Sequence, residues 1–240
     1  MTVRIRRRRL AAATALLLAG VLTACSSEPQ AQPAPTVSVV APTARPGAQP
    51  APLPAKLTPD GTRVLVGRAS APHTVSVYED PRCPACATFE TTAGPELARL
   101  TAAGKVKVEY VLASFLDRTL GGSGSARAVN ALRASVDAGR FPAYHAAVFA
   151  SQPKKETVDG FTPDFLLAVA DQVPGLRGAA FDRAVRSHAH AAWVADAQKA
   201  YTTSGVPGAP SVVLDGKPLL QRTVSDASAF TKVLRAAGIG

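Results

Sequence analysis

The sequence predicts an α/β domain, and three observations lead to that prediction. Two short segments, 74–78 and 106–112, alternate apolar and polar residues and are rich in β-branched side chains, which is typical of strands. Between and after them, apolar residues recur at helical spacing. Late in the chain, two apolar runs flank Asp215-Gly216, a dipeptide typical of a tight hairpin turn. Strands interrupted by helices in this way indicate a mixed sheet covered by helices.

The composition fits one domain with appendages. The chain has 240 residues, 47% of them hydrophobic, and three cysteines, so it can bury a core without a disulfide scaffold. The formal charge is +10, but Arg4 and the four arginines of 6–9 contribute five of the 27 basic residues. Without them the balance is 22 − 17 = +5. No second dense basic run exists, so we expect no nucleic-acid partner.

Residues 1–24 have the pattern of a bacterial signal peptide. A basic segment at 4–9 precedes an uncharged run at 10–23, which is shorter than the roughly 20 apolar residues that cross a bilayer. The run ends in Leu22-Thr23-Ala24-Cys25, which resembles the lipobox of bacterial lipoproteins. The resemblance implies that Cys25 is lipidated and anchors the chain on the extracytoplasmic face of the cell membrane. An ordinary secretory signal with a chance cysteine is the alternative.

Residues 25–58 are interpreted as the lipidated cysteine and a linker. Eight of the 26 residues in 29–54 are proline, interleaved with Ala, Gln, Thr and Ser. Such a segment cannot bury enough apolar surface to fold, and it favours an extended spacer. The folded domain is therefore expected at 59–240.

Within this domain, the strand at 74–78 ends at Glu79-Asp80-Pro81, and a helical pattern follows over 84–103 with a kink expected at Gly94-Pro95. The strand at 106–112 precedes a block of helical patterns, about 120–204. A hairpin follows, with strands at 211–214 and 217–220. The last helix begins at Ser225 or Asp226 and runs to Ala237, where Gly238 stops it.

The chemistry is expected at Cys83 and Cys86, directly after a strand and at the opening of a helix. Pro84 suits a first helical turn, where its missing N–H has no partner to lose. A thiolate on Cys83 would face the unpaired N–H groups of that turn, so we expect the helix end to lower its pKa. Cys86, one turn later, is expected to be less exposed. Cys83 would then exchange disulfides with a substrate, and Cys86 would resolve the mixed disulfide.

Three other interpretations of this pair are weaker. A disulfide across so short a loop constrains little of the unfolded chain. A zinc site would need two further ligands, there is no second cysteine pair, and His188 and His190 lie about 200° apart on a helix. We therefore expect no metal site. Two inert buried thiols are not expected to persist in an oxidising compartment.

Two motifs resemble the DsbA-like thioredoxin superfamily. One is Tyr78-Glu79-Asp80-Pro81-Arg82-Cys83-Pro84-Ala85-Cys86; the other is Gly205-Val206-Pro207-Gly208-Ala209-Pro210, before the strand at 211–214. The segment 125–150 resembles the helical insertion of that superfamily. The resemblance covers about residues 60 to 240 and implies a thioredoxin-like fold with a helical insertion. It further implies a cis Pro210, with Ala209 and Pro210 against Cys83 as substrate-binding residues, and with Pro84 and Ala85 supporting the active site.

The resemblance implies a thiol–disulfide oxidoreductase acting on exported proteins that contain cysteines. Its redox group would be the Cys83–Cys86 disulfide, with no other cofactor, re-oxidised by a membrane partner similar to DsbB or VKOR. An exported location favours an oxidant, because exported disulfides must be made. A reductase or isomerase of the same fold, serving one exported partner, and a non-enzymatic peptide-binding module are the alternatives.

One position departs from the pattern of thioredoxin-like proteins. Many of them have a buried acid six residues before the first cysteine, where this chain has Val77. Glu79 and Asp80 are expected to be solvated at the end of the strand, so neither is assigned a catalytic role. His145 and His188 follow apolar patterns and are expected to be core or boundary residues.

Overall fold

The computed structural model describes residues 53–240. The expected signal peptide, Cys25 and most of the expected linker lie outside these residues. Within them, no helix has the length and apolar character needed to cross a membrane.

A six-stranded mixed sheet forms the centre of the described domain, with the strand order β1-β2-β4-β3-β5-β6. β3 and β4 pair in parallel, and the other neighbours pair antiparallel. Val75 and Val77 of β3 are fully buried and alternate with half-buried residues, as expected for a strand inside a covered sheet. The strands are β1 (Ala55–Leu57), β2 (Val64–Val66), β3 (His73–Glu79), β4 (Val106–Leu112), β5 (Ser211–Leu214) and β6 (Lys217–Pro218).

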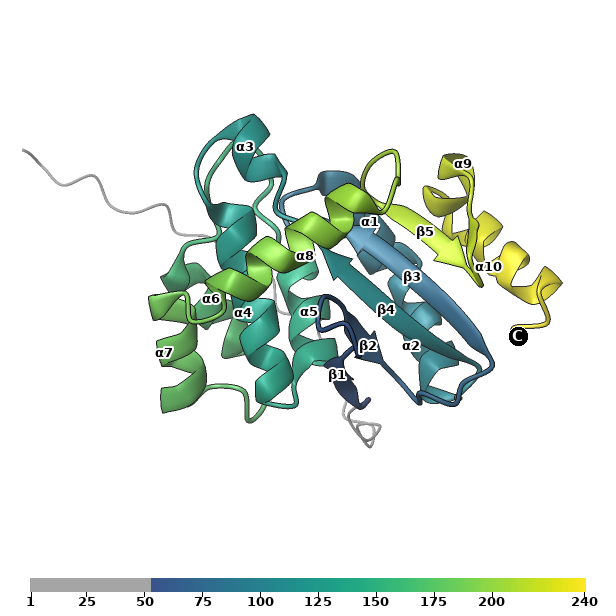
Figure 1. The fold of residues 1–240 in the computed structure, drawn as a ribbon, viewed down its shortest axis with the longest axis horizontal. Helices are drawn as coiled ribbons and strands as arrows, with labels where there is room; N and C mark the ends of the chain where they lie inside the picture. Colours follow the sequence, from purple (N-terminus) through teal and green to yellow (C-terminus); the bar gives the residue numbers. More distant parts are fainter. Residues whose placement is uncertain (1–52) are drawn as a thin grey trace, which may run out of the picture. The chain divides into compact units, whose positions relative to one another are not determined.

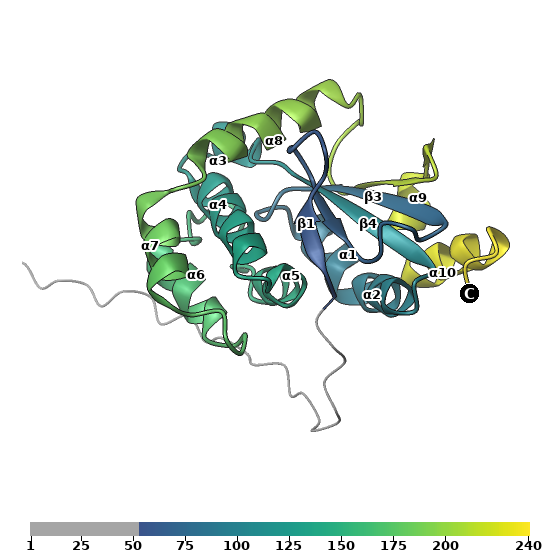
Figure 2. The ribbon, with the colours of Figure 1, turned by 60° about the horizontal axis from the view of Figure 1, so that its bottom comes forward.

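Helices cover both faces of this sheet. In Figures 1 and 2, α1, α2 and α10 lie on one face, α8 crosses the other, and α4 to α7 form a helical block beside the sheet. Phe89 of α1 packs edge-on against Phe230 of α10, with ring centroids 5.4 Å apart. The helices are α1 (Pro84–Thr92), α2 (Gly94–Ala102), α3 (Leu116–Leu120), α4 (Gly124–Asp137), α5 (Phe141–Ala150), α6 (Pro163–Ala170), α7 (Ala179–Ser187), α8 (Ala191–Thr203), α9 (Gln221–Val224) and α10 (Ala227–Ala236).

One hydrophobic cluster joins the helical block to the sheet. It includes Val77 of β3, Leu132 of α4 and Phe165 of α6, together with Phe230 of α10. The sheet and the helical block therefore share a core, so side chains from the block can hold the end of β3 in place.

From β3 onward the strands and helices follow the expected order, except that the second hairpin strand ends at Pro218 and the short helix α9 follows it. The kink expected at Gly94-Pro95 is a break between α1 and α2. The hairpin turn has φ of 47° at Asp215 and 79° at Gly216, the positive pair of a type I′ turn.

Two strands at the start of the domain were not predicted. β1 lies inside the segment interpreted as a linker, so the ordered fold begins at least four residues before the expected boundary at 59. β1 has only three residues, and the three residues of β2 are all buried, so neither shows the alternation that identifies a strand from sequence.

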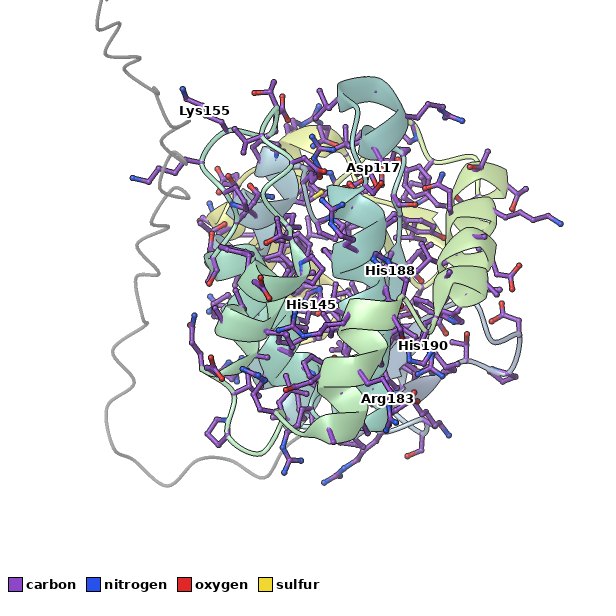
Figure 3. The ribbon with its side chains drawn as sticks, turned by 90° about the vertical axis from the view of Figure 1, so that its left-hand side faces the viewer. Asp117, His145, Lys155, Arg183, His188 and His190 are labelled. Atoms are coloured by element: carbon purple, nitrogen blue, oxygen red, sulfur yellow. The ribbon has the colours of Figure 1, made fainter. Side chains whose placement is uncertain are left out.

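The expectation that His188 is a core or boundary residue is wrong, because its side chain is exposed. α7 ends at Ser187, and His188 caps it in the left-handed conformation with φ of 54°. Its side chain is exposed, and Figure 3 shows its position next to the insertion helices. The helical pattern through Phe181 and Val185 stops one residue before His188.

Candidate active site

Cys83 occupies the N-cap of α1, directly after the turn that follows β3. Its Sγ accepts a hydrogen bond from the Cys86 N–H at 3.4 Å, and Pro84 occupies the first turn of the helix. The Cys83 sulfur at the N-cap thus accepts a hydrogen bond from one of the N–H groups that have no partner within the helix. This is the arrangement expected from the sequence.

The two thiols differ in access to solvent. Both are free; Cys83 is 8% exposed and Cys86 is fully buried. Pro84 and Ala85, between them, are exposed. An incoming group can therefore reach the Cys83 sulfur before it reaches the Cys86 sulfur.

The surroundings move the two pKa values in opposite directions. A hydrogen bond with the Cys86 thiol is the largest effect that lowers the pKa of Cys83, and the N–H groups of Cys86 and Ala85 lower it further, against the effect of burial. Burial, followed by interaction with Cys83, raises the pKa of Cys86 well above its usual value. The helix end was the expected source of stabilisation for a Cys83 thiolate; the hydrogen bond with the Cys86 thiol has a larger effect on its pKa than either backbone N–H taken singly.

Ala209 and Pro210 lie against Cys83, although 126 residues separate Ala209 from it in the chain. The Ala209–Pro210 peptide bond is cis, and the Cys83 thiol donates to the Ala209 carbonyl oxygen at 3.4 Å. Phe149 of α5 completes a small apolar cluster with the two cysteines and Ala209. The two sequence motifs therefore meet at one site.

The expectation that Asp80 is solvated is wrong, because it is fully buried beneath the turn. Its carboxylate accepts hydrogen bonds from the N–H groups of Arg82 and Leu116 and from the Ser125 hydroxyl. Burial raises the pKa of Asp80 to about 6, although these hydrogen bonds oppose the shift. The Asp80 carboxyl group therefore connects the turn before Cys83 to Leu116 of α3 and Ser125 of α4.

The insertion also holds the turn through Arg82 and Gln152. Arg82 is 2% exposed and forms an ion pair of 2.9 Å with Asp117, which is labelled in Figure 3. Its guanidinium also donates to the carbonyl oxygens of Gly121 and Glu156. Gln152 donates from Nε2 to the carbonyl oxygens on either side of Arg82, those of Pro81 and Cys83.

A family model described as thioredoxin matches residues 59–233, which is most of the chain. The chain belongs to the thioredoxin family. No curated protein sequence matches it.

Solved structures share the fold of this thioredoxin-family chain. Oxidised BdbD from Bacillus subtilis is 21% identical, with a TM-score of 0.60 over 73% of this chain and 92% of that one. A reduced disulfide bond oxidoreductase, DsbG, from Mycobacterium tuberculosis is 22% identical, with a TM-score of 0.59 over 80% and 91%. Oxidised DsbA from the same organism is 23% identical, with a TM-score of 0.59 over 78% and 93%. The fold is therefore DsbA-like, as the sequence predicted.

Glu79, at the end of β3, is also fully buried, which corrects the expectation that it is solvated. Burial raises the pKa of Glu79 well above its usual value, and charge on Cys83 or Asp80 would raise it further. Glu79 in turn contributes to the raised pKa of Cys86. A buried acid therefore affects the pKa of the buried cysteine, although Val77 rather than an acid occupies the usual position.

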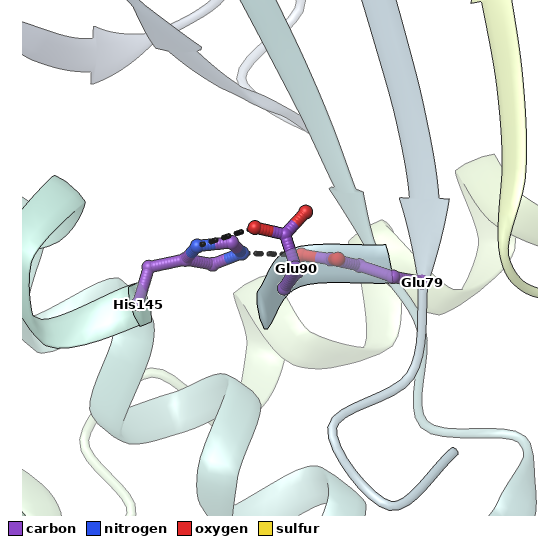
Figure 4. Close-up of side chains that lie close together, drawn as sticks. All are labelled: Glu79, Glu90 and His145. Atoms are coloured by element: carbon purple, nitrogen blue, oxygen red, sulfur yellow. Dashed lines mark hydrogen bonds and ion pairs between the residues drawn. The ribbon is translucent and has the colours of Figure 1, made fainter. Parts of the chain in front are cut away.

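Figure 4 shows the ring of His145, from α5, with the carboxylates of Glu79, from β3, and Glu90, from α1, on one side of it. Its Nε2 is 2.5 Å from Oε1 of Glu79, and its Nδ1 is 3.7 Å from Oε2 of Glu90. Burial lowers the pKa of His145 and raises the pKa of Glu90 to about 8.

The sequence identified His145 as a core residue, which is confirmed: it is 3% exposed and packs against Tyr110, Phe141 and Phe149. The sequence did not indicate that Glu79 and Glu90 are partners of His145, because the three residues come from different elements and share no spacing pattern.

Proposed function

We propose that the chain is a thiol–disulfide oxidoreductase that introduces or exchanges disulfides in exported proteins. The observation that carries this proposal is the position of Cys83, at the N-cap of α1 and in contact with the Ala209 carbonyl oxygen. A thiol with a lowered pKa beside a buried resolving thiol has the properties that disulfide exchange requires.

In the proposed reaction, the Cys83–Cys86 disulfide accepts two electrons from a substrate dithiol. A substrate thiolate attacks the Cys83 sulfur, the Cys83–Cys86 bond breaks, and Cys86 leaves with the electron pair and takes up a proton. The second substrate thiolate then attacks the substrate sulfur of the mixed disulfide. Cys83 leaves as a thiolate, and the substrate carries the new disulfide.

Substrate backbone would lie along Ala209 and Pro210. An extended peptide can pair with exposed backbone groups, and the proline offers no competing N–H. The carbonyl oxygen of Ala209, 3.4 Å from the Cys83 sulfur, would direct the substrate chain past the reacting sulfur.

Several features favour the oxidising direction. An oxidant holds its reduced form in a stabilised state, and the hydrogen bonds from Cys86 and the helix N–H groups to the Cys83 sulfur act in that sense. Pro84 and Ala85 add no side-chain donor, so we expect a potential between about −120 mV and about −270 mV, the values of a strong oxidant and of a thioredoxin.

The proposed location is the extracytoplasmic face of the bacterial cell membrane, with a lipid anchor at Cys25 and the proline-rich segment as a spacer. The support is the sequence pattern of residues 1–24 and the lipobox-like tetrad. A membrane protein similar to DsbB or VKOR would re-oxidise the dithiol, since the proposed cycle leaves two electrons on it.

Two measurements test the proposed function. Equilibration of the dithiol with glutathione gives the potential, and a value near about −270 mV would contradict an oxidant. In the Cys86→Ala variant, the Cys83 thiolate can attack a disulfide of an exported protein and release one of its thiols, so mixed disulfides through Cys83 should accumulate. The matched control, Cys83→Ala, should form none. A Cys86→Ala variant that traps nothing would support a peptide-binding module instead.

A further inference from the structure

Glu79, Glu90 and His145 form a buried cluster of three potential metal ligands. They come from β3, α1 and α5, and one donor atom from each lies within 4.8 Å of the other two. Their side chains are 0%, 5% and 3% exposed. In Figure 4 the two carboxylates point toward the same edge of the imidazole ring.

Each carboxylate of this cluster has one oxygen atom without a hydrogen-bond partner among the described residues. Oε2 of Glu79 and Oε1 of Glu90 are buried and have no hydrogen-bond partner among the described residues. The ring nitrogens of His145 already face the other two oxygens. Buried polar atoms normally have a partner, and a buried oxygen without one is costly, so the two free oxygens point to a further ligand.

The composition of the cluster favours a cation as that ligand. Across residues 53–240, His145 is the one ion-pair partner of either carboxylate. Two buried acids therefore share one imidazole, which can carry at most one positive charge. Such groups are stable in a protein interior when they are protonated or when they coordinate a metal ion.

A cavity beside the cluster gives an ion space and a route of access. A partly open cavity of about 130 Å³ is bordered by Glu90, His145 and Tyr110. This volume exceeds the roughly 30 Å³ that one water takes in the liquid, so an ion can enter with a bound water.

We propose that Glu79, Glu90 and His145 bind one divalent transition-metal ion, with Zn²⁺ the best match. Zinc accepts imidazole nitrogen and carboxylate oxygen at about 2.0–2.2 Å, and it combines three protein ligands with a water in a tetrahedral shell. The fourth position would face the cavity. Ca²⁺ prefers six to eight oxygen ligands, which these three side chains do not provide.

The test uses the full chain with Cys83→Ser and Cys86→Ser, so that no reactive-site thiol can hold the metal. Titration calorimetry with Zn²⁺ should give one site per chain with release of protons, because ligands must be deprotonated to bind. Co²⁺ in place of Zn²⁺ should give the visible absorption of a tetrahedral site without a thiolate charge-transfer band.

In the same background, Glu90→Gln and His145→Gln should each weaken binding at least tenfold. His188→Gln is the matched control, since His188 is exposed and distant from the cluster in the chain, and it should bind as before. Circular dichroism reports whether each variant folds. If one variant does not fold, the other variant and the Co²⁺ spectrum still decide.

Absence of binding by the folded chain with Cys83→Ser and Cys86→Ser would overturn the proposal and leave a hydrogen-bonded cluster only. Binding that neither substitution weakens would also overturn it, because the ion would then lie elsewhere. Absence of zinc binding would not contradict the proposed function, which depends on Cys83 and Cys86. Failure of disulfide exchange would not change the calorimetric result.

Discussion

Replacing Arg82 by methionine is expected to destabilise the protein by about 3–5 kcal/mol. Arg82 is 2% exposed, and the side chain of its partner Asp117 is 13% exposed. Removing one member of a buried ion pair leaves the other charge without compensation, which typically costs this amount. Asp117 would keep the N–H groups of Ser125 and Ala126, so we expect the lower half of the range.

The exposed pair between Arg186 and Asp164 provides a matched control. Its N–O distance of 2.8 Å is close to the 2.9 Å of the buried pair, but its side chains are 58% and 82% exposed. Arg186→Met should therefore change stability by no more than about 0.5 kcal/mol. The buried pair differs from the exposed one in burial and in the hydrogen bonds from Arg82 to the carbonyl oxygens of Gly121 and Glu156, so the comparison measures these two effects together.

Urea unfolding followed by circular dichroism measures both free energies. A domain with a stability of about 5–15 kcal/mol should show a clear fall in midpoint for Arg82→Met and none for Arg186→Met. Equal effects of the two substitutions, or a loss below about 1 kcal/mol for Arg82→Met, would refute the argument from burial.

Three further predictions follow from the site and the core. The pH midpoint of Cys83 alkylation by iodoacetamide, measured by mass spectrometry, should lie below that of an ordinary thiol. It should rise in Cys86→Ala, because the hydrogen bond with the Cys86 thiol is the largest effect that lowers the pKa of Cys83. An unchanged midpoint would assign the lowered pKa to the helix end. The raised pKa of Asp80 means that the folded state holds the Asp80 proton more tightly than the unfolded state does. The protonated carboxyl therefore contributes stability below about pH 4, and this contribution is lost as the pH rises toward 6. Asp80→Asn should flatten this part of the plot of unfolding free energy against pH, and a plot as steep as that of the wild type would contradict the prediction. Phe89→Ala should lower the unfolding free energy, measured in urea, by about 3–5 kcal/mol, since Phe89 is 1% exposed and packs on Phe230. Leu220→Ala, at a 56% exposed position, should lower it little. Similar losses for the two variants would be inconsistent with this packing.

The position of Cys83 could be predicted from the sequence because its causes are local. A β-branched strand, a proline in the first helical turn and a cysteine before it are all visible within ten residues. The meeting of Cys83 with Ala209 required the resemblance to a known family, because no local rule connects residues 126 positions apart.

The burial of Glu79 and Asp80 could not be predicted in the same way. At the end of a strand, acids are normally solvated, and only the insertion packed over the turn removes them from water. Ser125 and Leu116 supply hydrogen bonds to Asp80, and His145 supplies the partner of Glu79. These contacts depend on how the insertion folds back onto the sheet, which a pattern of periodicity does not reveal.

Oxidation of a reduced, unfolded secreted protein by the oxidised chain tests the proposed oxidoreductase function most directly. Stoichiometric wild-type protein should form disulfides in this substrate faster than glutathione disulfide alone, and Cys83→Ser should abolish the gain. Substrate oxidation that is no faster with the wild type than with Cys83→Ser would contradict it.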